Sequence, residues 1–128
     1  MGRKKKRKNR VPAEVADIVR SRASYMCELM IRDAGCNGKA QHLHHRKMRS
    51  QGGEHTVENL VSACTNCHHY VHMKPAISYS HGWLVRSTRD PDHEPFLRRG
   101  GAVLLLEDGG FEHVAEIAGL NLESNERQ

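Results

Sequence analysis

Residues 42–72 read HLHHRKMRSQGGEHTVENLVSACTNCHHYVH, and this stretch decides the fold of the chain. Residues 40–45 and 60–64 are short runs of the kind that form β-strands. The polar segment between them (47–58) contains a Gly-Gly pair typical of an ordered loop. Residues 65–74 then show a helical pattern. The stretch therefore predicts a strand, a loop, a second strand and a helix in direct succession.

The segments on either side of this stretch add a helix and further strands. Apolar side chains recur at helical spacing over residues 12–23, which predicts an N-terminal helix. Thr65 is the expected N-cap of the second helix, and Pro75 is expected to end it. Residues 82–85 are expected to form a strand, and residues 102–114 a β-hairpin around Asp-Gly-Gly. The predicted fold class is therefore α+β.

Composition limits the class of protein. The 128 residues suit a single domain, but only 38% are hydrophobic, so the core needs an additional stabilising element. No apolar run approaches the ~20 residues that span a bilayer, and the basic start lacks the apolar segment of a secretory signal. We therefore expect no membrane association and a cytoplasmic location, where cysteines stay reduced and serve as metal ligands more readily than as disulfides.

Charge is distributed unevenly along the chain. Residues 1–50 contain 14 Lys and Arg against 4 Asp and Glu, whereas residues 51–128 contain 6 against 11. Because like charges repel, residues 1–10 are expected to form a disordered basic arm that meets a polyanion. A solvated tail and a chance match to a nuclear-import signal are the alternatives for this arm.

The cysteines form two pairs, Cys27 with Cys36 and Cys64 with Cys67. Four thiolates supply the tetrahedral shell that zinc prefers, and a closed shell of this kind is structural. The two-residue spacing of Cys64 and Cys67 at a helix start is the stronger half of the pattern, since the first pair is more widely spaced. The alternative is a set of buried cysteines without metal.

Histidines provide a second candidate metal site. His44 and His45 are neighbours on a predicted strand, so their side chains face opposite sides. His68 and His72 are four residues apart on the predicted helix, so both rings lie on one face and can bind one ion, with His44 as a third ligand. A clamp of His69 and His72 is the alternative. The remaining histidines are expected to be solvated or core residues: His42, His55, His69, His81, His93 and His113.

Taken together, these motifs strongly resemble the HNH endonuclease family over about residues 24–74. The motifs that carry the resemblance are Leu43-His44-His45-Arg46, Gly52-Gly53, Glu58-Asn59-Leu60 and Cys64-x2-Cys67-His68-x3-His72. The three letters of the family name correspond to His45, Asn59 and His68. The cysteine pairs flank the motif as they do in members whose ββα-metal fold is held by zinc.

The resemblance implies a ββα-metal nuclease with a structural zinc ion that hydrolyses phosphodiester bonds of DNA. His45 would be the general base that activates water, while Asn59, otherwise typical of a cap or turn, would bond the loop backbone and hold His45 in place. His44, His68 and His72 would bind one divalent cation that stabilises the scissile phosphate and the leaving oxygen. Many members have aspartate at the position of His44, and imidazole favours Zn²⁺ or Ni²⁺, with Mn²⁺ and Mg²⁺ as alternatives.

Two groups of basic residues are expected to contact DNA phosphates. These are Arg46, Lys47 and Arg49 beside the histidine pair, and Lys4, Lys5 and Lys6 in the arm. The expected division of the chain is a basic arm (1–10), a nuclease domain with its N-terminal helix (11–75), an extension with the β-hairpin (76–120) and a tail (121–128).

The extension is similar to that of small HNH nucleases encoded by phages. Its Gly-Trp and Asp-Pro elements and its closing hairpin carry this likeness. It implies DNA-packaging (terminase) proteins as further partners, in a host cytoplasm, and we expect a monomer or weak dimer. Two rival hypotheses remain: a zinc-held nucleic-acid-binding module without catalysis, and an assembly protein that uses the module as a scaffold.

Overall fold

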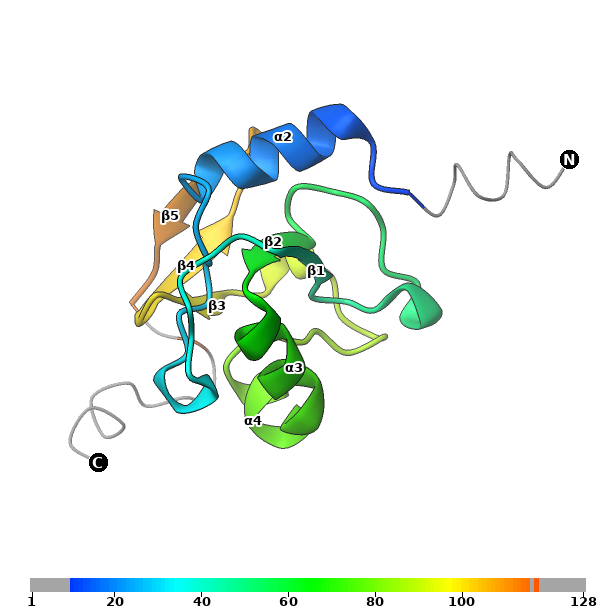
Figure 1. Cartoon of the computed structure of the whole chain (residues 1–128). Helices are drawn as coiled ribbons and strands as arrows, with labels where there is room; N and C mark the ends of the chain where they lie inside the picture. The colour runs from blue at the N-terminus through cyan, green and yellow to red at the C-terminus, as the bar shows by residue number, and fades with distance from the viewer. Residues whose placement is uncertain (1–9, 116, 118–128) are drawn as a thin grey trace, which may run out of the picture.

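The computed structural model describes residues 10–115 and 117, so Lys4, Lys5, Lys6, most of the expected arm and the tail (121–128) lie outside the described residues. A two-stranded and a three-stranded sheet are joined by helices and loops (Figure 1). In chain order the helices and strands are α2 (Ala13–Arg22), β1 (His42–His45), β2 (Leu60–Ala63), α3 (Thr65–Met73), α4 (Pro75–Ser80), β3 (Phe96–Arg98), β4 (Gly101–Leu105) and β5 (Phe111–His113). Short 3-10 helices lie at Arg32–Ala34, Arg49–Gln51 and Pro91–His93.

The succession expected from residues 42–72 is present. Strands β1 and β2 pair antiparallel, with His44 opposite Val61, and α3 begins two residues after β2 ends. The expected N-cap is wrong by one residue. Cys64, not Thr65, caps α3, because its Sγ accepts a hydrogen bond from the backbone N–H of Cys67 at 3.3 Å. A cysteine sulfur therefore takes the acceptor position that we assigned to a hydroxyl.

Pro75 does not end the helical region, contrary to the expectation. It is the first residue of α4, where the missing N–H of proline costs nothing and its fixed φ suits a helix start. The chain changes direction at Lys74 (φ −124°, ψ 66°), so α3 and α4 are separate helices. Pro75 therefore correctly marks the end of α3, but a second helix begins at the proline itself.

Residues 82–85 form no strand, which corrects another expectation. Gly82 has a φ of +75°, and a Cβ at this position would lie 2.1 Å from a neighbouring carbonyl oxygen, so only glycine fits. The carbonyl oxygens of Gly82 and Trp83 accept hydrogen bonds from the side chains of Arg46 and His44. The segment is an apolar loop outside any strand, and the N–H groups of Leu84 and Val85 donate to the carbonyl oxygens of Ser78 and Arg46.

The C-terminal hairpin is present and belongs to a larger sheet. Strands β4 and β5 pair antiparallel, with Leu105 opposite Phe111. Strand β3 pairs with the other edge of β4, with Phe96 opposite Val103. We did not expect β3, because its three residues are too few to show a period.

One hydrophobic core joins the two sheets. Val61 and Val71 of the strand–helix module are buried together with Trp83, Phe96 and Leu105 of the extension. A smaller cluster packs α2 against the module through Val19, Val57 and Leu60. Within residues 10–115 and 117, no helix has the length and apolar character needed to span a bilayer.

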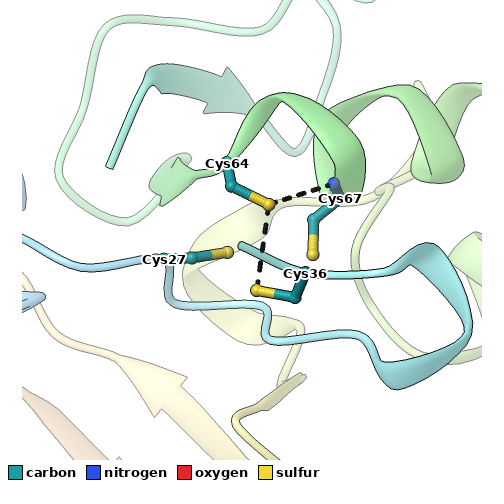
Figure 2. A group of neighbouring side chains, drawn as sticks. All are labelled: Cys27, Cys36, Cys64 and Cys67. Carbon is teal, nitrogen blue, oxygen red and sulfur yellow. Dashed lines mark hydrogen bonds between the residues drawn. The ribbon is translucent and has the colours of Figure 1, made fainter. Parts of the chain in front are cut away.

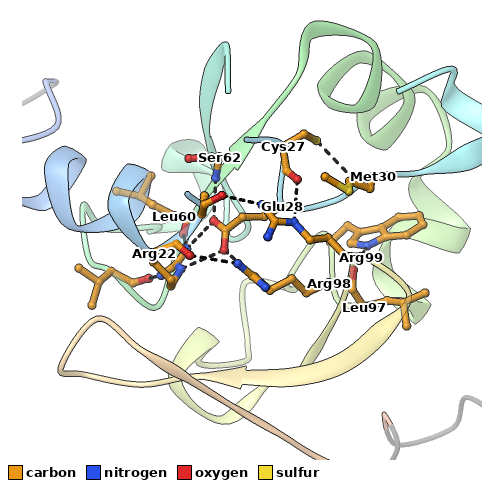
Figure 3. Close-up of polar contacts among 12 residues, drawn as sticks. Arg22, Cys27, Glu28, Met30, Leu60, Ser62, Leu97, Arg98 and Arg99 are labelled. Atoms are coloured by element: carbon orange, nitrogen blue, oxygen red, sulfur yellow. Dashed lines mark hydrogen bonds and ion pairs between the residues drawn. The ribbon is translucent and has the colours of Figure 1, made fainter. Parts of the chain in front are cut away.

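A buried ionic cluster fixes α2 and β3 to the module (Figure 3). The Glu28 carboxylate accepts hydrogen bonds from Arg22 at 2.8 and 2.9 Å, from Arg98 at 2.9 Å and from the backbone N–H of Ser62 at 3.0 Å. Burial alone raises the pKa of Glu28, but Arg22, Ser62 and Arg98 together hold it below its ordinary value. This carboxylate therefore connects a helix, β2 and β3, which are distant in sequence.

Candidate active site

Strand β1 and helix α3 bring three imidazoles together. The nearest ligand atoms of His44, His68 and His72 all lie within 4.8 Å of one another. The Nε2 atoms of His68 and His72 are 3.3 Å apart, close to the ~3.4 Å expected for two nitrogens that share one zinc ion at ~2.1 Å. These three residues fit a single divalent ion. The clamp of His69 and His72 is not formed, because His69 is exposed and outside the group.

The orientation of His44 is set by the extension. His44 is buried, and its Nε2 lies 2.7 Å from the carbonyl oxygen of Trp83. Because a carbonyl only accepts, Nε2 must carry the proton, which leaves the lone pair on Nδ1 for a metal. Burial lowers the pKa of His44 to about 3, although the bond to Trp83 opposes this change. The ring is therefore neutral at physiological pH, as a metal ligand must be.

His68 is also neutral and lies close to the other histidines. Its burial, followed by the charges of His72, His42 and His45, lowers its pKa to about 4. His42 is exposed, but its ring centroid lies 4.9 Å from that of His68, and its Nε2 lies 3.1 Å from the Thr65 hydroxyl. We expected His42 to be a solvated residue, and the structure places it at the edge of the site.

His45 is half-buried and follows His44 on β1. Its Nε2 lies 3.0 Å from Nδ1 of His55, a residue of the loop between β1 and β2. Burial, followed by the charges of His55 and Arg49, lowers the pKa of His45 to about 4. A neutral imidazole has a free lone pair, which is the state in which histidine acts as a base. The position of His55 here differs from the expectation of a solvated or core residue.

Asn59 bonds the loop backbone, as we expected. Its Oδ1 accepts from the backbone N–H of Lys47 at 2.7 Å, and its Nδ2 donates to the carbonyl oxygens of Lys47 and Glu54, both at 3.0 Å. The two ends of the loop are therefore tied to one buried amide. Gly53 allows the loop to fold this closely, because a Cβ there would lie 1.7 Å from the Lys47 carbonyl oxygen.

The expected DNA contact at Arg46 is wrong. Arg46 is fully buried, and its guanidinium donates to the carbonyl oxygens of five residues: Gly82, Glu58, Pro91, Glu94 and Pro95. It holds the extension against the module and cannot reach a phosphate. Lys47 is partly exposed, with its Nζ 3.1 Å from the Arg89 carbonyl oxygen, and Arg49 is exposed.

The four cysteines converge at the start of α3, where Cys64 and Cys67 lie (Figure 2). The Sγ atoms of Cys27, Cys36, Cys64 and Cys67 lie within 4.8 Å of one another, and the distance from Cys36 to Cys64 is 3.8 Å. This distance matches the ~3.8 Å between two sulfurs that share a zinc ion at ~2.3 Å. Each sulfur accepts one backbone N–H, at 3.3 to 3.5 Å, and such bonds stabilise thiolates. The group can therefore hold a zinc ion.

A hairpin that is followed directly by a helix, with three converging histidines and a four-cysteine group, is the arrangement typical of the ββα-metal class of nuclease modules. Residues 26–74 match the sequence model of the HNH endonuclease family. The match over these residues confirms the resemblance to that family and the fold class expected from the motifs. The substrate class of the family is nucleic acid. No curated protein and no solved structure matches the chain.

Two parts of the site could not be read from the motifs. His55 contacts His45 only because the loop folds back on Asn59, and its position two residues after the Gly-Gly pair was the one available signal. The Trp83 carbonyl that orients His44 is a backbone atom of a distant segment. Every residue has a backbone carbonyl, so the residue type at position 83 gives no signal of this contact.

Proposed function

We propose that this chain is a metal-dependent endonuclease that hydrolyses phosphodiester bonds of DNA. The observation that carries this proposal is the convergence of three imidazoles, those of His44, His68 and His72, while His45, whose pKa is lowered to about 4, occupies the next position of β1. Its support is the family match over residues 26–74. An alternative without catalysis explains the cysteine group but not the ordered histidines and Asn59.

In the proposed reaction, His45 takes the proton from the attacking water. Its low pKa keeps the lone pair available over the physiological range. Asn59 holds the loop, so that the partner of His45 stays in place. His44, His68 and His72 would hold one divalent ion, and imidazole ligands favour Zn²⁺ or Ni²⁺, with Mn²⁺ and Mg²⁺ as alternatives. When bound, such an ion stabilises charge on the scissile phosphate and the leaving oxygen.

We further propose that the four cysteines hold a structural zinc ion and that basic residues near the site bind the DNA backbone. Support for the zinc comes from the four converging sulfurs and their backbone N–H partners. Support for backbone binding comes from Arg49, which is exposed and lies in the same loop as His55. Phosphate contacts of this kind weaken as salt rises.

The test is nicking of a supercoiled plasmid with added Mn²⁺, Ni²⁺, Zn²⁺ or Mg²⁺. The wild-type chain should cleave, and His45→Ala should keep its fold and its metal but lose cleavage. His113→Ala is the matched control, because His113 is exposed on β5 and should leave cleavage unchanged. If the wild-type chain is inactive with every metal while it still binds DNA, the non-catalytic binding module is the correct function.

A second pair of variants tests the metal ligands. His68→Ala removes one of the three converging rings, and we expect loss of one bound ion and of cleavage. His69→Ala changes the neighbouring exposed ring on the same helix and should bind metal and cleave like the wild type. Equal activity of the two variants would contradict the assignment of His68.

A further inference from the structure

His55 stands in contact with the side chain that acts as base in the proposed function. Its Nδ1 lies 3.0 Å from Nε2 of His45, and the two ring centroids are 5.1 Å apart. Two imidazole nitrogens at this distance share one hydrogen, so one ring donates and the other accepts. The direction of this bond decides which nitrogen of His45 carries its lone pair.

Only one of the two directions suits a base. If His55 donates from Nδ1, it occupies the lone pair on Nε2 of His45, and the proton of His45 then lies on Nδ1. If His45 donates from Nε2, the lone pair lies on its Nδ1, which can take a proton from water. The second arrangement also leaves His45 Nε2–H in place when the ring becomes positively charged.

We infer that His55 is a positioning residue that accepts a hydrogen bond from Nε2–H of His45 and so directs the Nδ1 lone pair of His45 toward the attacking water. This inference rests on the proposed function of His45. His55 thereby fixes both the tautomer and the orientation of the ring of His45.

Hydrogen bonds on both sides of His55 restrain the loop that carries it. The carbonyl oxygen of Glu54 accepts from Nδ2 of Asn59 at 3.0 Å. The carbonyl oxygen of Thr56 accepts from the backbone N–H groups of Asn59 and Leu60, both at 3.1 Å. The residues on both sides of His55 are therefore bonded to the start of β2. Asn59 thus acts on His45 through His55, which gives a physical route for its influence on the base.

Substitutions at His55 separate positioning from mere packing. Asparagine can place an amide oxygen near the position of Nδ1, whereas glutamine reaches the position of Nε2, and alanine provides no acceptor. We expect His55→Ala to lower kcat on the order of 10-fold to 100-fold, with KM and bound metal unchanged. His55→Asn should restore most of kcat, and His55→Gln should not. Equal kcat in all variants, or a change in KM alone, would overturn the inference.

A spectroscopic measurement makes the test independent of cleavage. Nitrogen-detected NMR of the zinc-loaded full chain reports which ring nitrogen of His45 is protonated. The proton should lie on Nε2 in the wild type and in His55→Asn, and the two tautomers should mix in His55→Ala. A proton on Nδ1 in the wild type would overturn the inference. Because this readout needs no DNA, an inactive wild-type chain would refute the nuclease proposal while the tautomer still decides the role of His55.

Discussion

Among residues 10–115 and 117, Arg46 is the largest fully buried side chain, and its hydrogen-bond partners there are carbonyl oxygens and not carboxylates. Its planar guanidinium instead satisfies carbonyl oxygens of the loops at 82 and 91–95. A buried acceptor that loses its donor costs about 1–3 kcal/mol. The guanidinium of Arg46 therefore bonds the extension to the module. The guanidinium of Arg49, three residues later, lies in an exposed side chain.

Substitution of Arg46 should mainly lower the stability of the fold, whereas substitution of Arg49 should mainly weaken DNA binding. Arg46→Lys should lower the free energy of unfolding by about 3 kcal/mol or more, because an ammonium group reaches fewer of the five carbonyl oxygens. Arg49→Ala should change stability by about 1 kcal/mol or less but weaken DNA binding at low salt. Urea unfolding and a binding titration measure the two effects. An Arg46→Lys protein as stable as the wild type would contradict the structural role.

Residue types and spacing predicted a large part of the site. The four-residue spacing of His68 and His72 follows from helix geometry, and the alternation along β1 separates His44 from His45, so both could be predicted. The roles of Arg46 and His55 depend on the path of loops. Nothing local in the sequence distinguishes an arginine that binds carbonyl oxygens from one that binds phosphate.

Among the elements, α2 depends on the Glu28 cluster for its position. The side chains of Arg22 and Glu28 are 2% and 0% exposed, so neither charge is solvated when its partner is removed. Glu28→Gln should therefore lower the free energy of unfolding by about 3–5 kcal/mol. Glu14→Gln, an exposed change in the first turn of α2, should alter it by about 0.5 kcal/mol or less. Similar melting of both variants would show that the cluster contributes little.

The cysteine group should determine whether the start of α3 forms at all. Cys64 is both a proposed zinc ligand and the N-cap of α3. Removal of zinc by a chelator, or Cys64→Ser, should abolish cooperative unfolding, since apparent binding energies of structural zinc reach ~10–16 kcal/mol. Cobalt substitution gives an absorption band from thiolate ligands. His68→Ala should keep this band and Cys64→Ser should weaken it, and an unchanged band in Cys64→Ser would exclude the cysteine site.

Elements with a strong local pattern could be predicted, and others could not. The hairpin of β4 and β5 has an Asp-Gly-Gly turn between apolar runs, and the sequence shows both features. Residues 82–85 are apolar in the same way, but their backbone bonds go to Arg46 and His44. An apolar run indicates burial, whereas strand formation also needs a free neighbouring edge, which only the tertiary structure provides.

For the molecule as a whole, the extension and the module depend on one another. The core contains Val61 and Val71 from one part and Phe96 and Leu105 from the other. A fragment of residues 1–80 should therefore bind zinc but lack a cooperative thermal transition, because it exposes this core. Circular dichroism melting against the full chain measures this. A fragment that melts cooperatively and cleaves DNA would show that the extension is a separate unit.

The contact between His44 and the Trp83 carbonyl has a consequence for synthesis of the chain. The ribosome makes all three histidine ligands and His45 before it reaches residue 83. Until that residue has emerged and folded back, His44 has no fixed tautomer and the module has no complete core. A nascent polypeptide that ends before residue 83 therefore carries the whole motif but lacks the contact that orients His44 and the part of the core against which Val61 and Val71 pack.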